Sequence, residues 1–155
     1  WMCLSGPKQN AKSYIQGVNL LSSMRLCSNV PAQSIIQTAL GGIQSADELL
    51  LPGGRLFEQR EVIYNELSAI DGISVVKPDA AFYIFPKIDT QKIHINNDEK
   101  FAMDLLKKKY VLISHGTGFN MPEPGYFRIV YLPDKEILHE ACVRLGSFLQ
   151  TYSQF

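Results

Sequence analysis

Arg128 lies inside an otherwise apolar run, residues 126–132, whose aromatic and β-branched side chains favour a covered strand. Its guanidinium cannot lose its proton there, because an arginine pKa is above about 12. The cation therefore needs an anion, and its planar fork of N–H donors fits a carboxylate through two parallel hydrogen bonds. The strand alone leaves two interpretations open. Arg128 is either a structural ion pair or a side chain reaching solvent from an edge strand, or a receptor for the α-carboxylate of an amino or keto acid.

A Gly-Thr-Gly segment, residues 116–118, leads directly into this strand. It does not complete a G-x-G-x-x-G phosphate fingerprint, because Met121 occupies the sixth position. Its two glycines permit positive φ, so we expect a tight loop that brings backbone close to a ligand. His115, just before the loop, is a candidate general base. No nucleophile or orienting carboxylate stands at a recognisable spacing from it, so we expect a loop histidine without a catalytic role.

The remaining chemically interesting residues have simpler explanations. The acidic stretch 97–99 is best interpreted as the cap and first turn of a helix. Ser5 and Lys8 match the S-x-x-K pattern of serine hydrolases, but the S-D-N and K-T-G partner motifs are missing, and a helix start explains them better. The three cysteines show no C-x-x-C spacing and the three histidines no paired spacing. The residues alone therefore predict no metal site and reduced cysteines, as in a cytosolic protein.

Composition excludes several classes of function. Fifteen basic and fifteen acidic residues give zero net charge, and the densest basic cluster, residues 107–109, suits the end of a helix. A nucleic-acid-binding surface would need a stronger positive field, so we expect no nucleic-acid partner. No apolar run approaches the ~20 residues of a membrane span, so we expect no membrane partner.

Hydrophobic periodicity predicts the elements that position Arg128. We expect helices over residues 7–24, 32–39, 55–70, 98–109 and 133–149, and strands over residues 1–4, 73–76, 81–85, 110–114 and 126–132. The strands at 73–76 and 81–85 are predicted to form a hairpin, and residues 89–97 a polar loop. Beyond residue 54 helices alternate with a small sheet, which predicts an α/β (α+β) two-layer domain. Residues 1–44 are mostly helical and are expected to belong to another unit. Because Trp1 begins a strand-like stretch, we expect a piece of a longer protein.

Five segments in order carry a resemblance to a known family. They are Trp1-Met2-Cys3-Leu4-Ser5-Gly6-Pro7-Lys8, Met24-Arg25-Leu26-Cys27-Ser28-Asn29-Val30-Pro31-Ala32-Gln33, Leu51-Pro52-Gly53-Gly54-Arg55-Leu56-Phe57-Glu58-Gln59-Arg60, Phe82-Tyr83-Ile84-Phe85-Pro86-Lys87-Ile88 and Phe127-Arg128-Ile129-Val130-Tyr131-Leu132-Pro133. Together they resemble class I aminotransferases, and within these the bacterial glutamate–pyruvate (alanine) aminotransferase group. The resemblance covers essentially the whole chain.

This resemblance implies a pyridoxal-phosphate enzyme of fold type I, homodimeric and cytoplasmic, that passes an amino group between amino acids and 2-oxo acids, here glutamate and pyruvate. The chain would be its C-terminal third. Residues 1–44 would be the C-terminal remnant of the large PLP-binding domain, and residues 45–155 the small C-terminal domain. Arg128 would grip the substrate α-carboxylate, with residues 116–118 beside the substrate. Ser28 and Asn29 would approach the partner subunit's active site.

The same resemblance places the Schiff-base lysine, the aspartate that binds the pyridine nitrogen and most phosphate ligands upstream of Trp1. We therefore assign no catalytic, cofactor-binding or metal residue within this chain, and expect the chain alone to be inactive. Ala80-Ala81 replaces the family's usual Gly-Ala, which would add a methyl group near the substrate. Two alternatives remain open: a non-catalytic amino-acid-binding α/β module, and a class I aminotransferase acting on aspartate or aromatic amino acids.

Overall fold

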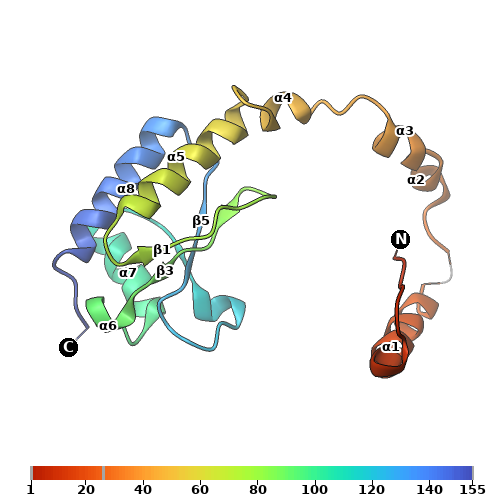
Figure 1. Ribbon diagram of the computed structural model, residues 1–155, viewed down its shortest axis with the longest axis horizontal. Helices are drawn as coiled ribbons and strands as arrows, with labels where there is room; N and C mark the ends of the chain where they lie inside the picture. The colour runs from red at the N-terminus through yellow and green to blue at the C-terminus, as the bar shows by residue number, and fades with distance from the viewer. Residues whose placement is uncertain (1, 26, 155) are drawn as a thin grey trace. The chain divides into compact units, whose positions relative to one another are not determined.

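The computed structural model describes residues 2–25 and 27–154. The chain divides into two compact units, an N-terminal unit, Trp1–Gln44, and a C-terminal unit, Ser45–Phe155. Each is described by itself (Figure 1). The described part of the N-terminal unit is helical, and the C-terminal unit combines helices with small sheets, as the alternating pattern predicts.

The N-terminal unit consists of short helices. They are η1 (Gln9–Ala11), α1 (Lys12–Ser23), α2 (Val30–Ser34) and α3 (Ile36–Gly41). Asn29 caps α2 by accepting a hydrogen bond from the Ala32 amide at 3.2 Å, as the Ser-Asn-Val-Pro sequence predicts. The helix expected over residues 32–39 is instead interrupted at Ile35. Residues 2–4 form no strand, and the remainder of that predicted strand, Trp1, lies outside the described residues.

The described part of the C-terminal unit combines three long helices with two short ones and a 3-10 turn. They are α4 (Asp47–Leu50), α5 (Arg55–Ala69), α6 (Thr90–Ile93), α7 (Asp98–Lys109) and α8 (Lys135–Leu149), together with the single turn η2 (Gly116–Phe119). Asn97 caps α7 by accepting from the Lys100 amide at 2.8 Å. Acidic residues in the first turn of α7 and lysines in its last turn complement the helix dipole. The predicted helices at 55–70, 98–109 and 133–149 are therefore confirmed within a few residues.

Five short strands form two antiparallel sheets. The strands are β1 (Ile73–Ser74), β2 (Tyr83–Ile84), β3 (Lys87–Ile88), β4 (Ser114–His115) and β5 (Phe127–Val130). One sheet pairs β1 with β3, and the other has the order β2-β5-β4. The predicted hairpin between residues 73–76 and 81–85 is wrong, because β2 pairs with β5 and leaves β1 to β3. The chain changes sheets at Phe85-Pro86, where the Pro86 carbonyl accepts from the Phe127 amide at 3.2 Å.

Two other strand and loop predictions need correction. Residues 110–113 are not a strand, because Tyr110 ends α7 in a left-handed conformation and only Ser114–His115 pairs with β5. The stretch 89–97, predicted as polar loop, contains α6 and the buried side chains of Ile93 and Ile95. Its polar residues outnumber these two isoleucines, so composition concealed a short element whose apolar side faces the core.

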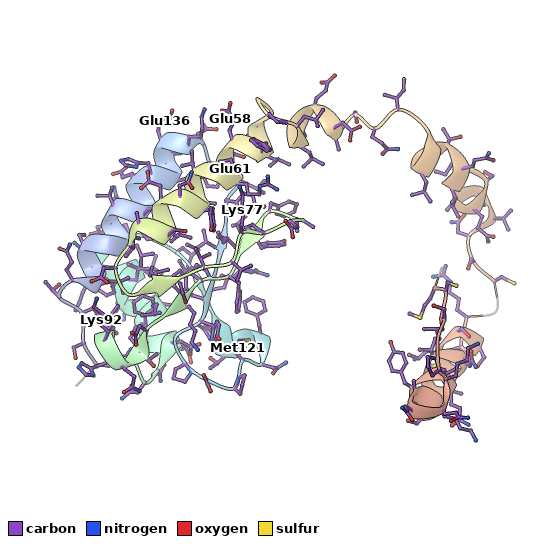
Figure 2. All side chains as sticks on the ribbon, in the orientation of Figure 1. Glu58, Glu61, Lys77, Lys92, Met121 and Glu136 are labelled. Carbon is purple, nitrogen blue, oxygen red and sulfur yellow. The ribbon has the colours of Figure 1, made fainter. Side chains whose placement is uncertain are left out.

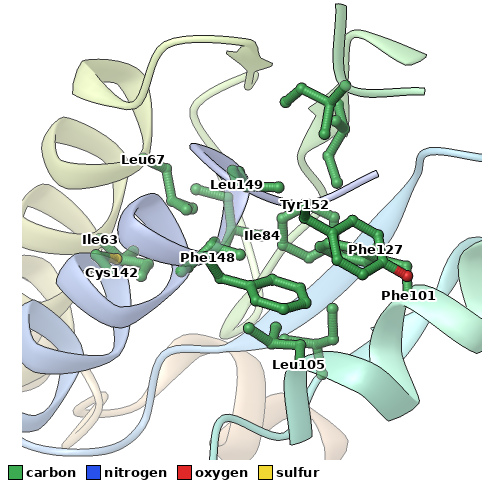
Figure 3. Close-up of a cluster of buried hydrophobic side chains, with 14 of the residues drawn as sticks. Ile63, Leu67, Ile84, Phe101, Leu105, Phe127, Cys142, Phe148, Leu149 and Tyr152 are labelled. Atoms are coloured by element: carbon green, nitrogen blue, oxygen red, sulfur yellow. The ribbon is translucent and has the colours of Figure 1, made fainter. Parts of the chain in front are cut away.

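Helices α5 and α8 run side by side along the C-terminal unit (Figure 1). Figure 3 shows the core, which α5, α7 and α8 share with the strands. The ring of Phe101 on α7 contacts three other rings of this core, with centroids 6.1 Å from Phe127, 5.8 Å from Phe148 and 5.4 Å from Tyr152. This shared core holds β5 rigidly, and β5 carries Arg128. Among the described residues, no helix combines the length and apolar character that crossing a bilayer requires.

Candidate functional site: a strand arginine flanked by aromatic rings

The alternation of side chains along β5 decides where Arg128 points. Phe127 is almost completely buried, and Ile129 packs against the same core as Ile84, its partner on β2. Successive residues of a strand face opposite sides, so Arg128 projects from the other face. Residues directly opposite each other in a sheet share a face, which places Ser114 of β4 beside Arg128.

Two aromatic rings flank the guanidinium. The Arg128 Cζ atom lies 4.5 Å from the ring centroid of Tyr83 on β2 and 4.4 Å from that of Phe119 at the end of η2. At these distances the ring quadrupoles attract the cation. The rings cover the charge, while the N–H donors lie in the guanidinium plane.

No internal carboxylate neutralises Arg128 among residues 2–25 and 27–154, where the structure shows eight ion pairs and none involves this arginine. The side chain is half-buried, and its Nε is fully buried with no hydrogen-bond partner in that part of the chain. Leaving such a donor unpaired costs about 1–3 kcal/mol. The structural ion pair is therefore excluded within the described residues, and the guanidinium has no carboxylate partner there.

The turn η2 is fixed to α7 by a buried carboxylate. Asp98, only 3% exposed, accepts two hydrogen bonds from Thr117, from the amide to Oδ2 and from the hydroxyl to Oδ1, each at 2.8 Å. The sequence assigned this acid to helix capping. Asn97 performs the capping, and Asp98 instead ties the Gly-Thr-Gly turn to the helix. No sequence signal indicates this second role, because the burial of Asp98 follows from the tertiary structure.

His115 and the two glycines shape the same turn. The Gly118 amide donates to His115 Nδ1 at 3.1 Å, so the imidazole acts as a structural cap of η2. Neither Gly116 nor Gly118 has a positive φ, which corrects the expected reason for their presence. A Cβ at Gly116 would stand 2.6 Å from the Tyr126 Cβ. Gly116 is required because the turn packs directly on the chain that enters β5.

The far end of β5 is held by buried polar contacts. Gln59 Nε2 on α5 donates to the carbonyls of Leu132 at 3.0 Å and Pro133 at 2.7 Å. The Tyr131 hydroxyl donates to the Ala81 carbonyl at 2.8 Å, and burial raises the pKa of this phenol. Ala81 adopts a left-handed φ of 59° and is therefore under backbone strain, whereas Ala80, which stands where the family usually has glycine, has no positive φ.

Ala80 and Ala81 line a cavity of about 340 Å³ together with Arg60 and Tyr131. Arg128 does not line this cavity, so the expectation that Ala80-Ala81 reshapes the substrate pocket stays a prediction. The described residues bring no group of three or more histidines, cysteines or acids into a metal-binding arrangement.

Five lysines of the C-terminal unit form ion pairs with carboxylates, which makes them poor sites for attaching an aldehyde cofactor. Lys77 donates to Glu61 at 2.7 Å, as Figure 2 lets the reader follow, and Lys92 pairs with Asp71. Hydrogen bonding to Asp104 raises the pKa of Lys100, and hydrogen bonding to Glu58 raises that of Lys135. A Schiff base forms only from the neutral amine, so ion pairing opposes this role.

Comparisons with known proteins place the chain in a family. Residues 10–145 match the model of the family described as aminotransferase class I and II. The chain belongs to the aminotransferase class I and II family. It is 55% identical to "Glutamate-pyruvate aminotransferase AlaA" of Haemophilus influenzae over 99% of its own length and 38% of that protein. It is 49% identical to "Alanine aminotransferase" of Mycobacterium tuberculosis over 99% of its own length and 36% of that protein.

Solved structures place the same fold in longer chains. An aminotransferase crystal structure from Escherichia coli matches with a TM-score of 0.76 at 49% identity, covering 100% of this chain and 38% of that one. An alanine aminotransferase from Pyrococcus furiosus matches with a TM-score of 0.66 at 37% identity, covering 93% and 36% respectively. The chain therefore spans less than two fifths of the length of these relatives.

Proposed function

We propose that this chain is the C-terminal portion of a pyridoxal-phosphate-dependent aminotransferase that transfers an amino group between glutamate and pyruvate or alanine. Membership of the family and the names of the similar relatives support the reaction class and the substrates. The observation that carries the assignment of a site is Arg128, a shielded cation without an internal carboxylate among the described residues. Its ligand is the α-carboxylate of the substrate.

This receptor suits a transamination cycle because every participant carries the same group. Glutamate, alanine and the two corresponding 2-oxo acids all present a carboxylate next to the reacting carbon. The edge of the Arg128 fork holds that carboxylate in one plane and so orients the reacting carbon. Tyr83 and Phe119 reduce competition from water, which strengthens each charge-assisted hydrogen bond.

Pyridoxal phosphate, when bound, supplies the electron sink for the amino-group transfer. The ion-paired lysines of the C-terminal unit do not suit its attachment, and on this proposal a lysine upstream of this chain provides it. Residues 1–44 would contribute to the cofactor-binding domain, and Ser28 and Asn29 would lie near the partner subunit's site in a cytoplasmic homodimer. On this proposal the 155-residue chain alone has no transaminase activity.

Two alternatives concern specificity and catalysis. An aspartate aminotransferase from Pyrococcus horikoshii is 38% identical over 93 residues, covering 60% of this chain. A receptor for the α-carboxylate is equally suited to aspartate or aromatic substrates, so substrate profiling of the whole protein distinguishes these reactions. A non-catalytic amino-acid-binding module would bind the same carboxylate without turnover.

The test removes the guanidinium in the full-length protein. Arg128→Ala is expected to lower kcat/KM for glutamate and for alanine alike, by about 2–4 kcal/mol of transition-state binding. Arg128→Lys is expected to restore only part of this loss, because an ammonium lacks the planar fork. Arg144→Ala is the matched control, since this arginine pairs with Glu140 on the surface of α8.

Steady-state kinetics with both amino donors would decide the assignment. Unchanged kcat/KM in Arg128→Ala would remove Arg128 from substrate binding. A protein that binds glutamate tightly and never transfers its amino group would support the binding module instead.

A further inference from the structure

We propose that Asp98 is a positioning residue for substrate binding, acting through Thr117 and Phe119 on Arg128. The inference rests on the proposed function of Arg128 and extends it to a buried carboxylate that lies outside the arginine's own contacts. Asp98 belongs to α7 and Arg128 to β5, so the link passes from helix to turn to strand.

The first step of this link is a rigid joint between α7 and η2. Both carboxylate oxygens of Asp98 accept hydrogen bonds from Thr117. One accepts from its amide and the other from its hydroxyl, each at 2.8 Å. A carboxylate that accepts two short hydrogen bonds while 3% exposed fixes its partner more firmly than a solvent-exposed contact would. Thr117 is the second residue of a four-residue turn, so its position sets the path of the whole turn.

The second step leads from the turn to the guanidinium. Phe119 is the last residue of η2, and its ring centroid lies 4.4 Å from Arg128 Cζ. The ring is also held from the side, because Phe85 meets it edge-on at 5.9 Å. Movement of Thr117 would therefore shift the ring that limits where the guanidinium lies, while β5 and its core contacts stay in place.

The third step concerns the arginine itself. Its Nε makes no hydrogen bond within the described residues, and no carboxylate there holds the fork. Ring contacts with Tyr83 and Phe119 are thus its main restraints on the outer face of the sheet. Without the hydrogen bonds between Asp98 and Thr117, the Arg128 guanidinium would sample more orientations. Part of the binding free energy of the substrate carboxylate would then be needed to order it.

The experiment uses the full-length enzyme and compares isosteric changes. Asp98→Asn removes the charge that holds Thr117, and Glu99→Gln is the matched control, since it removes the same charge from an exposed position in the same first turn. Asp98→Asn is expected to raise KM for glutamate and alanine by about 3- to 30-fold, the range of a lost cation–ring contact, with kcat nearly unchanged. Glu99→Gln should leave both constants unchanged.

A second set of variants covers the case in which Asp98→Asn fails to fold. Phe119 is 42% exposed, so substitution there does not open the core. Phe119→Leu should reproduce the rise in KM, and Phe119→Tyr, which keeps the ring, should restore the parent value. The inhibition constant of propanoate, which carries a carboxylate but no amino group, should rise by the same factor as KM.

A double-mutant cycle separates positioning from general destabilisation. In the Arg128→Ala background, Asp98→Asn and Phe119→Leu should cause no further loss of kcat/KM, because the group they position is gone. Penalties that persist in that background, or a fall in kcat at constant KM, would overturn the role of Asp98. If Arg128→Ala itself leaves kcat/KM unchanged, the proposed function fails first, so the two failures are distinguishable.

Discussion

Both units of this chain contain helices, but they differ in how far the side chains of those helices are buried. In the N-terminal unit no described side chain is buried. Large apolar side chains stand in water instead, as at Leu21 and Ile43. The C-terminal unit buries a continuous core around Phe101 (Figure 3). The helices of the N-terminal unit therefore lack the tertiary packing of an apolar face that normally stabilises a helix.

This contrast shows which part of the sequence is self-sufficient. Helices of five or six residues such as α2 and α3 are too short to be stable in isolation. Their exposed apolar side chains need a covering surface that the N-terminal unit does not itself supply. The C-terminal unit has its own core, and within it β5 carries the one side chain that we assign to substrate.

The largest effect that would test this contrast is expected in the core. Phe101→Ala should lower the free energy of unfolding of the 155-residue chain by about 3–5 kcal/mol, because three other rings lose their contacts. Leu21→Ala in the N-terminal unit is the counterpart and should change it by less than about 0.5 kcal/mol. Urea unfolding followed by far-ultraviolet circular dichroism measures both. Equal losses would show that the N-terminal unit has a core of its own.

The second-largest expected effect is the pH dependence of the free energy of unfolding that the buried Cys142 causes. Burial raises the pKa of Cys142 to about 12 from an ordinary value of 9.0. A raised folded pKa gives stability that is fully present below pH 9 and is lost as pH rises toward 12. The free energy of unfolding should therefore fall by about 1 kcal/mol per pH unit in that window.

Cys142→Ala is the control for this pH dependence, since only its thiol is removed. Its free energy of unfolding should fall less steeply above pH 9 than that of the parent chain. Identical slopes would contradict the burial of the thiol. Thiol labelling under native conditions should reach the exposed Cys3 and Cys27 of the N-terminal unit quickly, and Cys142 only after unfolding.

Sequence alone predicted the parts of the C-terminal unit that depend on local periodicity. The helices carrying Leu67, Leu105 and Leu145 follow from apolar residues at helical spacing, and the strand around Arg128 from its β-branched and aromatic neighbours. The pairing of strands was not predictable in the same way. Residues 73–76 and 81–85 are neighbours in sequence, but β2 pairs with the distant strand β5, and β1 pairs with β3, just beyond β2.

The candidate site also has a part that the local sequence predicts and a part that depends on tertiary structure. Arg128 stood out because a charge interrupts an apolar run. The rings beside it, Tyr83 and Phe119, come from elements 45 and 9 residues away and meet it only through the register of β2 with β5 and the path of η2. The role of Asp98 was missed because a helix cap explained the acid without reference to tertiary structure.

The smallest effect concerns backbone strain, which also differs between the units. The C-terminal unit holds four non-glycine residues at positive φ, whereas in residues 2–25 and 27–44 a positive φ occurs only at Gly6. A packed core can hold such strained residues in place, and an unpacked helix cannot. Ala81, at φ 59°, is held by the hydrogen bond from Tyr131 to its carbonyl.

Ala81→Gly should therefore raise the free energy of unfolding by about 0.5–1 kcal/mol, because glycine adopts this conformation without steric cost. Ala80→Gly is the matched control, since Ala80 has no positive φ. It should lower the free energy by about 0.4–1 kcal/mol, because glycine only adds freedom to the unfolded chain. Opposite signs at adjacent alanines, measured by urea unfolding, would locate the strain at Ala81. A loss at both positions would mean that the C-terminal unit relaxes this residue and does not hold it strained.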